Sequence, residues 1–273
     1  MAGIYVAFEN YTYQGGLFGS EFVGLKNFEF FFANIHYALR ATRNTLVINI
    51  GSIVIGTSLN VAVAIMLGEV SNERFRKGVQ TAILLPHFLS WIVIGALSDT
   101  LLADKGGMIN KLIMSLGGTP IRWSMSPQYW WTIIITATVW KGFGYGSIVY
   151  YATLTGFDPA LYEAAIIDGA SRFKRILYIT IPLLRSTIVV LFLLDIGRVL
   201  NGSLDQIMGM TKMNPLLFET TDTVTTFVYR TTTQNAQFGT ASAINLYQSL
   251  FGCILVLSAN LVAKKIDPDY ALF

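Results

Sequence analysis

The sequence predicts an all-α integral membrane protein with about five full transmembrane helices, and three observations support this. Hydrophobic residues make up 53% of the 273 residues and charged residues only 13%, whereas a typical soluble domain has about 25% charged residues. The mean hydropathy is +0.54. Five apolar runs approach the roughly 20 residues that a helix needs to cross a bilayer, and more polar segments separate them.

The apolar runs and the turn residues between them set the predicted spans. These are residues 44–68, 78–98, 128–155, 183–201 and 241–263. Pro86 is expected to kink the second span, because proline has no amide hydrogen to donate within a helix. The segments 103–128 and 203–240 are rich in turn-forming or polar residues and are expected to be loops.

The start of the chain holds no complete predicted span. Residues 1–8 are apolar but too short to cross a bilayer, and a polar-aromatic stretch of the kind found at membrane interfaces follows them. We expect residues 1–41 to comprise the end of a truncated first helix and an external segment. Residues 42–273 are expected to form the transmembrane domain.

Several function classes are disfavoured by the composition and the motifs. A net charge of +3 is too small to argue for nucleic-acid binding. Two histidines, His36 and His87, with one distant cysteine argue against a metal site. That cysteine, Cys253, lies in an apolar run and is expected to be a small packing residue. Neither a Gly-x-x-x-x-Gly-Lys-Ser/Thr loop nor a recognisable nucleophile motif is present, so the chain is not expected to hydrolyse ATP alone or to be an enzyme.

Residues 157–182 lie between two apolar runs but cannot enter lipid themselves, because three basic residues fall within four positions. Asp158 suits a helix N-cap, and Pro159 suits the first helical position. Gly169 can end that helix in the left-handed conformation, and Ser171 can cap a second helix. The stretch therefore predicts a short, capped helix outside the membrane.

This short helix carries small side chains on one face, which lets the surface of another protein approach closely. A carboxylate near its positive end can accept an arginine from that partner. The face is formed by Leu161, Ala164, Ala165 and Asp168, and the carboxylate is that of Glu163. Pro182 is expected to mark a break before the next apolar run.

The spacing Glu-Ala-Ala, three residues, Gly, nine residues, Ile-x-Leu-Pro resembles the signature loop of permease subunits in binding-protein-dependent ABC importers. The matching residues are Glu163, Ala164, Ala165, Gly169, Ile179 and Pro182, with Ile181 where the pattern prefers leucine. Asp158-Pro159 before the loop and residues 24–28, Gly-Leu-Lys-Asn-Phe, resemble the maltose-type oligosaccharide branch. The resemblance covers nearly the whole chain.

The resemblance implies a type I ABC importer permease bundle in the cytoplasmic membrane of a prokaryote. The loop would be a coupling helix that docks into a cleft of a cytoplasmic ATPase. The implied partners are a homologous second permease, two ATPase subunits, an extracytoplasmic solute-binding protein, an oligosaccharide and membrane lipid. No cofactor is expected in this chain, because ATP and Mg would bind to the ATPase subunits. The expected ATPase-coupling residues are Glu163, Ala164, Ala165, Asp168, Gly169 and Ser171.

The distribution of Lys and Arg predicts an orientation, because cytoplasmic loops carry an excess of basic residues. With a cytoplasmic C-terminus, the inside segments hold nine basic residues among 48, and these segments are 69–77, 157–185 and 264–273. The outside segments then hold seven among 105, and these are 1–41, 103–128 and 203–240. The predicted coupling loop therefore lies in the cytoplasm.

Ionisable residues within the spans are candidates for a substrate pathway, because charge at membrane depth is costly and usually faces the bundle or a cavity. Asp195 and Arg198 are three apart on one predicted helix face, so they either neutralise each other or face the pathway. Asp99 and Arg185 lie at span ends and are expected to reach the membrane interface. The candidate pathway residues are Lys141, Tyr145, Asp195, Arg198 and Asn201.

Lys141 has no evident partner in the sequence, so the predicted bundle keeps a surplus positive charge. Such a charge suits an acidic oligosaccharide, and an acidic residue of the partner permease is the alternative. The glycines after it resemble the Gly-Tyr-Gly of potassium filters, but a fixed positive charge would repel cations. Close helix packing through Gly142 and Gly146 at small-xxx-small spacing is the prediction.

The sequence thus predicts half of a translocation pathway, which ATP switches from inward- to outward-facing through residues 163–169. An ion-coupled secondary transporter, with Asp195 as the coupling carboxylate, is the alternative from another class. A receptor or signalling membrane protein without solute flux is a third class.

Overall fold

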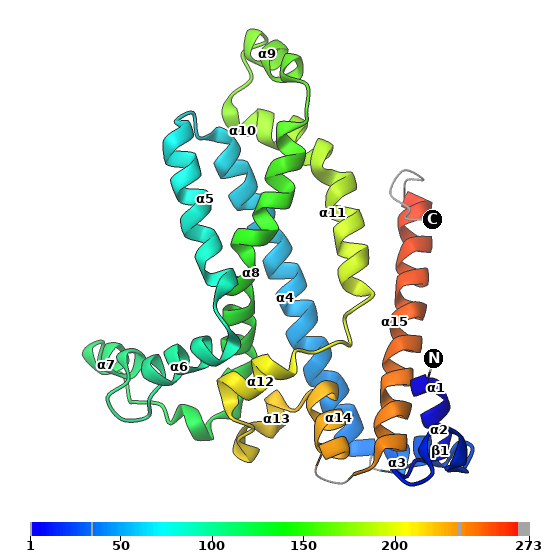
Figure 1. Cartoon of the computed structure of the whole chain (residues 1–273). Helices are drawn as coiled ribbons and strands as arrows, with labels where there is room; N and C mark the ends of the chain where they lie inside the picture. Colours follow the sequence, from blue (N-terminus) through cyan, green and yellow to red (C-terminus); the bar gives the residue numbers. More distant parts are fainter. Residues whose placement is uncertain (1, 34, 234–235, 267–273) are drawn as a thin grey trace. The chain divides into compact units, whose positions relative to one another are not determined.

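A computed structural model describes residues 2–33, 35–233 and 236–266 of the chain (Figure 1). It divides into two compact units, each built almost entirely of helices. The first unit comprises Met1–Ile50, Ser90–Ile135 and Gly197–Leu255. The second unit comprises Gly51–Leu89, Thr136–Ile196 and Val256–Phe273.

The N-terminal segment of the first unit is a small folded motif. Its elements are α1 (Ala2–Val6), β1 (Glu9–Asn10), α2 (Gly16–Gly19), β2 (Glu21–Phe22) and α3 (Lys26–Ala33). The two strands pair antiparallel, with Glu9 opposite Phe22. The side-chain amide of Asn27 donates hydrogen bonds to the carbonyl oxygens of Ala7 at 3.0 Å and Glu9 at 2.8 Å. The stretch predicted only as interfacial is therefore held together by its own hydrogen bonds.

The first long helix, α4, extends over Ile35–Glu69 and begins nine residues before the predicted span. The sequence predicts a start after Arg40 and Arg43, because charged residues are not expected within a span. Both arginines have carboxylate partners in the first unit, which are Asp222 and Glu219. Because their charges are paired, the helix continues through them.

The second predicted span is two helices rather than one kinked helix. They are α5 (Glu73–Phe88) and α6 (Trp91–Leu101), bent by 94° at the break between them. Pro86 lies inside the last turn of α5, so the prediction of a kink at the proline is wrong by a few residues. The break follows at Ser90, whose side chain accepts a hydrogen bond from the Val93 amide at 3.3 Å and caps α6.

The two segments predicted as loops contain further helices. Residues 103–128 hold α7 (Met108–Ser115), η1 (Trp123–Met125) and the start of η2 (Pro127–Tyr129). Residues 203–240 hold α12 (Leu204–Thr211), η4 (Pro215–Leu217), α13 (Phe218–Thr221), α14 (Val224–Thr233) and the start of α15 (Phe238–Ile266). The prediction of a long polar loop there is wrong, because capping and burial stabilise helices in spite of the many threonines.

Helix α12 packs closely on α6 within the first unit. A Cβ atom added at Gly95 of α6 would overlap the backbone of Gly209 of α12, and one added at Gly209 would meet the backbone of Trp91. The Ser203 side chain accepts a hydrogen bond from the Gln206 amide at 3.3 Å and caps α12. Two glycines and a serine cap thus place a polar segment against an apolar helix.

In the second unit, α10 (Arg172–Arg175), the π-helical η3 (Ile176–Thr180) and α11 (Ile181–Ile196) form one helix. The predicted break at Pro182 is therefore wrong. The amide of Ile181 donates to the carbonyl of Ile176 across the wider π turn. That turn precedes the proline, and a residue without an amide hydrogen is accommodated at the second position of α11.

Two further helices correspond closely to predicted spans. Helix α8 covers Trp130–Thr155, and its 26 residues are long enough to cross a bilayer. Helix α15 begins at Phe238, three residues before the predicted start of the last span. Cys253 in α15 is exposed in this chain, which contradicts its prediction as a small packing residue. Residues 267–273 of the predicted cytoplasmic tail lie outside the described residues.

Three described helices are both long and apolar enough to cross a membrane, and they cover Ile35–Glu69, Arg172–Ile196 and Phe238–Lys265. The bent pair of α5 and α6 counts as a fourth if both halves belong to one span. The mainly helical, membrane-spanning fold predicted from composition is confirmed.

Candidate functional site

The predicted coupling helix is α9, which covers Pro159–Ile167 and connects α8 to α10 (Figure 1). The Asp158 side chain accepts a hydrogen bond from the amide of Ala160 at 2.9 Å and caps the start. Gly169 adopts a φ of +75° at the end. The amide of Ala170 donates to the carbonyl of Ala165 at 2.8 Å, which is the hydrogen bond of a Schellman cap. Both predicted helix boundaries are confirmed.

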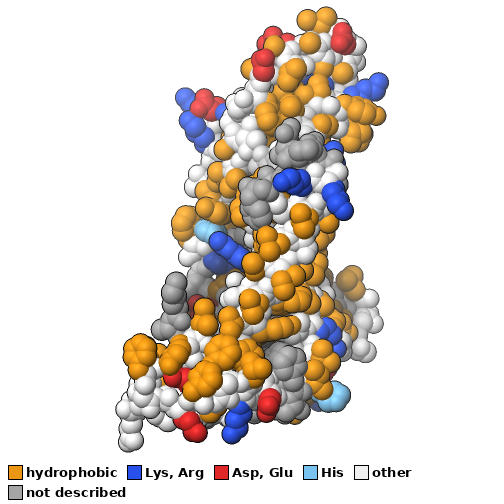
Figure 2. Space-filling model, turned by 90° about the vertical axis from the view of Figure 1, so that its right-hand side faces the viewer, with side chains coloured by type: hydrophobic (Ala, Val, Ile, Leu, Met, Phe, Trp, Pro, Cys, Tyr) orange, Lys and Arg blue, Asp and Glu red, His pale blue; other side chains and the backbone are white. Residues whose placement is uncertain are grey.

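The surface of α9 carries exposed apolar side chains. Ile167 is 86% exposed and Ile166 is 55% exposed. Glu163, Ala164 and Asp168 are also exposed. Figure 2 shows apolar side chains at the top of the view, where α9 lies, with acidic side chains among them. Exposed apolar groups beside charges are typical of a protein–protein contact surface. The exposure of these two isoleucine side chains is not predicted by the sequence, because an isoleucine in an apolar pattern usually indicates burial.

A cavity of about 500 Å³ lies beside α9 within the second unit. Among the residues that line it are Glu69, Arg76, Tyr151, Tyr162, Glu163 and Thr180. The Arg76 guanidinium lies over the Tyr151 ring, 5.7 Å from the ring centroid. The Tyr162 hydroxyl lies 3.3 Å from the Thr180 hydroxyl. Since Thr180 ends η3, this contact joins the predicted coupling helix to the π turn.

Lys141 of α8 meets the end of α5. Its Nζ donates hydrogen bonds to the carbonyl oxygens of His87 and Leu89, each at 2.6 Å. These carbonyls lie at the C-terminal end of α5, where the negative end of the helix dipole favours a cation. The His87 ring is stacked on the ring of Tyr145, with centroids 4.6 Å apart and planes 10° apart. Two candidate pathway residues therefore contact the broken span.

The remaining candidate pathway residues do not form the predicted arrangement. Helix α11 ends at Ile196, so Arg198 lies in the turn that follows, and the prediction that Asp195 and Arg198 share a helix face is wrong. The backbone oxygen of Asn201 accepts a hydrogen bond from the Asn49 side chain at 3.1 Å. Of the five candidates, two belong to the first unit, Arg198 and Asn201, and the other three belong to the second.

The glycine cluster of α8 packs differently from the prediction. A Cβ at Gly144 would overlap the backbone carbonyl of Ile83 in α5, and a Cβ at Gly146 would overlap the side chain of Asn60 in α4. A Cβ at Gly142 would meet no described atom within 4 Å. Gly144 and Gly146 thus allow α8 to pack closely against α5 and α4. The prediction of close helix packing through Gly142 is wrong.

A buried ion-pair network in the first unit was not predicted. The Asp222 side chain is fully buried and lies 3.0 Å from the Arg40 guanidinium and 2.8 Å from that of Arg230. It also accepts a hydrogen bond from the Thr226 hydroxyl at 2.9 Å. The network joins α4 to α14. Local sequence patterns do not reveal it, because Arg40 and Asp222 are 182 positions apart.

Comparison with known families identifies the chain. Residues 52–268 match the family described as the binding-protein-dependent transport system inner membrane component. The chain belongs to this family of permeases. The resemblance inferred from the Glu-Ala-Ala and glycine spacing is therefore confirmed, as is the placement in an inner membrane.

Two of three similar proteins are named for the transport of sugars or polysaccharides. This permease is 37% identical over 269 residues to the polygalacturonan/rhamnogalacturonan transport system permease protein YteP of Bacillus subtilis (strain 168), covering 98% of this chain and 83% of YteP. It is 36% identical over 269 residues to protein LplB of the same strain, covering 98% of this chain and 84% of LplB. It is 31% identical to the trehalose/maltose permease MalF of Thermococcus litoralis, covering 90% and 79% of the two chains.

The fold of this permease also occurs in a solved importer. A chain of a bacterial ABC transporter involved in the import of the acidic polysaccharide alginate superposes with a TM-score of 0.86 at 30% identity. The match covers 97% of this permease and 88% of that chain. A second structure, of an alginate transporter in complex with an alginate-bound periplasmic protein, gives a TM-score of 0.82 at 32% identity, covering 89% and 83%.

Proposed function

We propose that this permease is one of two transmembrane subunits of an ATP-driven importer of acidic oligosaccharides, and that α9 docks a cytoplasmic ATPase subunit. The observation that carries the docking role is the exposed apolar surface of a helix capped at both ends, at Asp158 and Gly169. A rigid helix with exposed Ile166 and Ile167 offers a partner apolar area without an ordering cost. The contact residues we propose are Glu163, Ala164, Ala165, Asp168, Gly169 and Ser171.

The roles that we propose for the partner subunits are those expected of this family of importers. ATP and Mg bind to two ATPase subunits, a second permease completes the pathway, and an extracytoplasmic binding protein delivers the solute. This chain supplies half of the pathway and needs no cofactor of its own. The bias of basic residues supports a cytoplasmic C-terminus, which also puts α9 on the ATPase side. Residues 42–273 are proposed as the transmembrane domain.

A contact between α9 and the π turn before α11 could transmit a movement of α9 to the membrane helices of the second unit. The Tyr162 hydroxyl contacts the hydroxyl of Thr180 at 3.3 Å, and Thr180 belongs to the π turn that leads into α11. π turns within α-helices are rare and are frequently found at functional sites. We infer that closure of the ATPase dimer displaces α9 and bends the chain at η3.

The acidic nature of the solute is supported by the names of similar proteins. YteP is named for polygalacturonan and rhamnogalacturonan, and both solved transporters are named for alginate. Tyr145, Asp195, Arg198 and Asn201 remain the proposed pathway residues. Lys141 is better explained as a positioning residue, because its ammonium group already binds two carbonyl oxygens at the end of α5.

The experiment is uptake into proteoliposomes that contain the complete importer and its binding protein. Oligogalacturonate and a neutral galactooligosaccharide of equal length are compared, with and without ATP, and with an ionophore that collapses ion gradients. We expect ATP-dependent uptake of the acidic sugar that the ionophore does not change. Uptake that stops with the ionophore would support the ion-coupled alternative, and preference for the neutral sugar would overturn the acidic substrate.

A further inference from the structure

Helix α7 of the first unit, which covers Met108–Ser115, carries an exposed apolar face. The face consists of Met108, Leu112 and Leu116, whose exposed fractions are 67%, 59% and 79%. These residues are four positions apart, so they lie on one side of the helix. Large apolar side chains grouped in this way mark a surface that contacts something else.

The orientation of α7 is fixed by hydrogen bonds on its other side and at its end. Asn110, which is 1% exposed, faces away from the apolar side, because each residue turns the helix by about 100°. Its side chain exchanges hydrogen bonds with the backbone of Ile121, at 2.8 Å to the carbonyl and 2.9 Å from the amide. The amide of Gly118 donates to the carbonyl of Ile113 at 2.8 Å and Gly117 has a φ of +83°, which together form a Schellman cap. The apolar face is therefore a built surface.

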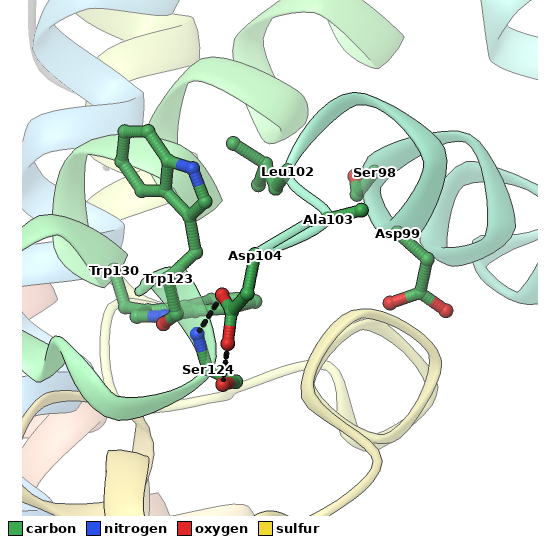
Figure 3. A pocket seen from close by; sticks show the side chains of 8 residues that line it. All are labelled: Ser98, Asp99, Leu102, Ala103, Asp104, Trp123, Ser124 and Trp130. Atoms are coloured by element: carbon green, nitrogen blue, oxygen red, sulfur yellow. Dashed lines mark hydrogen bonds between the residues drawn. The ribbon is translucent and has the colours of Figure 1, made fainter. Parts of the chain in front are cut away.

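The charge around this face is entirely positive. Residues 105–126 contain three basic residues and no Asp or Glu. All three are exposed, and none belongs to an ion pair in the part of the chain that the structure describes. The acid just before this segment, Asp104, is directed at Ser124, whose amide and hydroxyl donate to it (Figure 3). The basic residues are Lys105, Lys111 and Arg122.

Aromatic residues indicate the depth of this segment in the membrane. The indole rings of Trp123 and Trp130 lie beside the last turn of α6, around one small pocket (Figure 3). Tyr129 and Trp131 flank Trp130 where α8 begins. Trp and Tyr concentrate at the level of the lipid head groups. Since α7 connects the end of the apolar α6 to this aromatic start of α8, we expect it to lie at the membrane interface.

A protein partner is the alternative occupant of the apolar face, because an acidic protein surface would also suit the basic residues. Protein interfaces are usually anchored by Trp, Tyr or Arg, and this face consists of methionine and leucine. Aliphatic side chains on one side of a helix, flanked by lysine and arginine, are typical of helices that lie in the membrane interface. The composition thus favours lipid.

We propose that α7 lies in the membrane interface, with its apolar face among the acyl chains and with Lys105, Lys111 and Arg122 bound to the phosphates of anionic phospholipids. Lysine and arginine reach head groups while their alkyl stems cover apolar surface. With a cytoplasmic C-terminus, these lipids belong to the outer leaflet. The proposal rests on the membrane-spanning fold and not on the proposed solute or ATPase docking, so its failure would leave both of those unaffected.

The test places a fluorescent probe on the apolar face of the complete importer in lipid nanodiscs. Leu112→Cys is combined with Cys253→Ala, in an importer whose other subunits carry no cysteine, and the single thiol is labelled with bimane. The nanodiscs contain equal amounts of phosphatidylcholine and phosphatidylglycerol, and one of the two is brominated in its acyl chains near the head group. Bromine quenches a probe that contacts lipid, and iodide quenches a probe that contacts water.

We expect quenching by the brominated lipids and little quenching by iodide. Phosphatidylglycerol should quench more strongly than phosphatidylcholine, with a relative association constant of about five or more. That factor corresponds to about 1 kcal/mol, the contribution of one basic residue near an anionic surface. The measurement needs neither solute nor ATP, so it is separate from any assay of transport.

A triple variant and a matched control test the charges. Lys105→Gln, Lys111→Gln and Arg122→Gln together should abolish the preference for phosphatidylglycerol, while quenching by lipid persists because the apolar face is unchanged. Lys26→Gln removes an exposed basic residue at the start of α3 and should leave the preference as in the parent. A merely structural role of the three residues would lower the melting temperature without changing the ratio of quenching by the two lipids.

Four results would overturn the proposal. Strong quenching by iodide in the parent would place α7 in water. A probe shielded from both quenchers would show that another subunit covers the face. Quenching by iodide that disappears only when the binding protein is added would make α7 a docking surface for that protein. Equal quenching by the two lipids would show that the basic residues do not bind anionic head groups.

Discussion

Lys141 donates a hydrogen bond from Nζ to the carbonyl oxygen of Leu89 at 2.6 Å, and this contact explains a charge within an apolar helix. The helix α5 ends just before Leu89, and its last carbonyl groups have no amide partner in the helix itself. In a membrane protein such groups must be satisfied within the protein. The lysine therefore stabilises the break between α5 and α6.

We predict that Lys141→Met lowers the stability of the assembled importer. The methionine has a similar length but cannot donate, so the carbonyls of His87 and Leu89 lose an ammonium partner. The expected loss is about 1–3 kcal/mol, the cost of unsatisfied buried groups. Thermal unfolding of the purified complex measures it. Lys174→Met, at an exposed position in α10, is the control and should melt like the parent. Unchanged melting of Lys141→Met together with lost uptake would instead make Lys141 a substrate contact.

A second prediction concerns the glycines of α8. Gly144→Ala would place a methyl group against the backbone of Ile83, and overpacking of this kind costs about 1–3 kcal/mol. Gly142→Ala on the same helix is the matched control. Its methyl group would meet no described atom within 4 Å, so it should be neutral or stabilise the helix by up to about 1 kcal/mol. Yield and melting temperature in detergent compare the two. If Gly142→Ala is the more damaging variant, the packing described for α8 is incorrect.

The features that the sequence predicted well are those that depend on a few neighbouring residues. Asp158, Pro159 and Gly169 act on the backbone within one helical turn, so their roles in α9 could be inferred from type and position alone. The apolar runs likewise depend on composition over about 20 residues. The family spacing within residues 163–182 added the expected docking role, which remains a proposal.

The features that it predicted poorly depend on residues that are distant in the sequence. The segment 203–240 was expected to be a loop, because the contact of Asp222 with Arg40 cannot be read from a local pattern. The break expected at Pro182 is absent, because a π turn precedes the proline. The partner of Lys141 was not found, because it is the main chain of α5 and not a charged side chain.

A third prediction concerns the buried carboxylate of the first unit. Asp222→Asn removes a charge that faces both Arg40 and Arg230, and should lower stability by about 3–5 kcal/mol, as when one partner of a buried ion pair is removed. Glu219→Gln is the control. Its pair with Arg43 is exposed, with side chains 59% and 47% accessible, and such pairs contribute about 0–1 kcal/mol. Chemical denaturation of the two purified variants compares them. Equal losses would mean that the network does not hold α4 and α14 together.

The last prediction tests docking through α9. Gly169 has a φ of +75° and open space around it, so only backbone strain opposes a side chain there. Valine disfavours this conformation, so Gly169→Val should introduce about 1–2 kcal/mol of backbone strain. The chain would relieve this strain by leaving α9 in a different direction. Gly169→Asn tolerates the left-handed region and is the matched control. We expect both variants to insert like the parent and the valine variant to melt a few degrees lower because of this strain. Only the valine variant should lose ATPase binding in pull-down and ATP-driven uptake. Normal uptake by Gly169→Val, or equal loss in both variants, would show that the conformation at Gly169 does not control coupling.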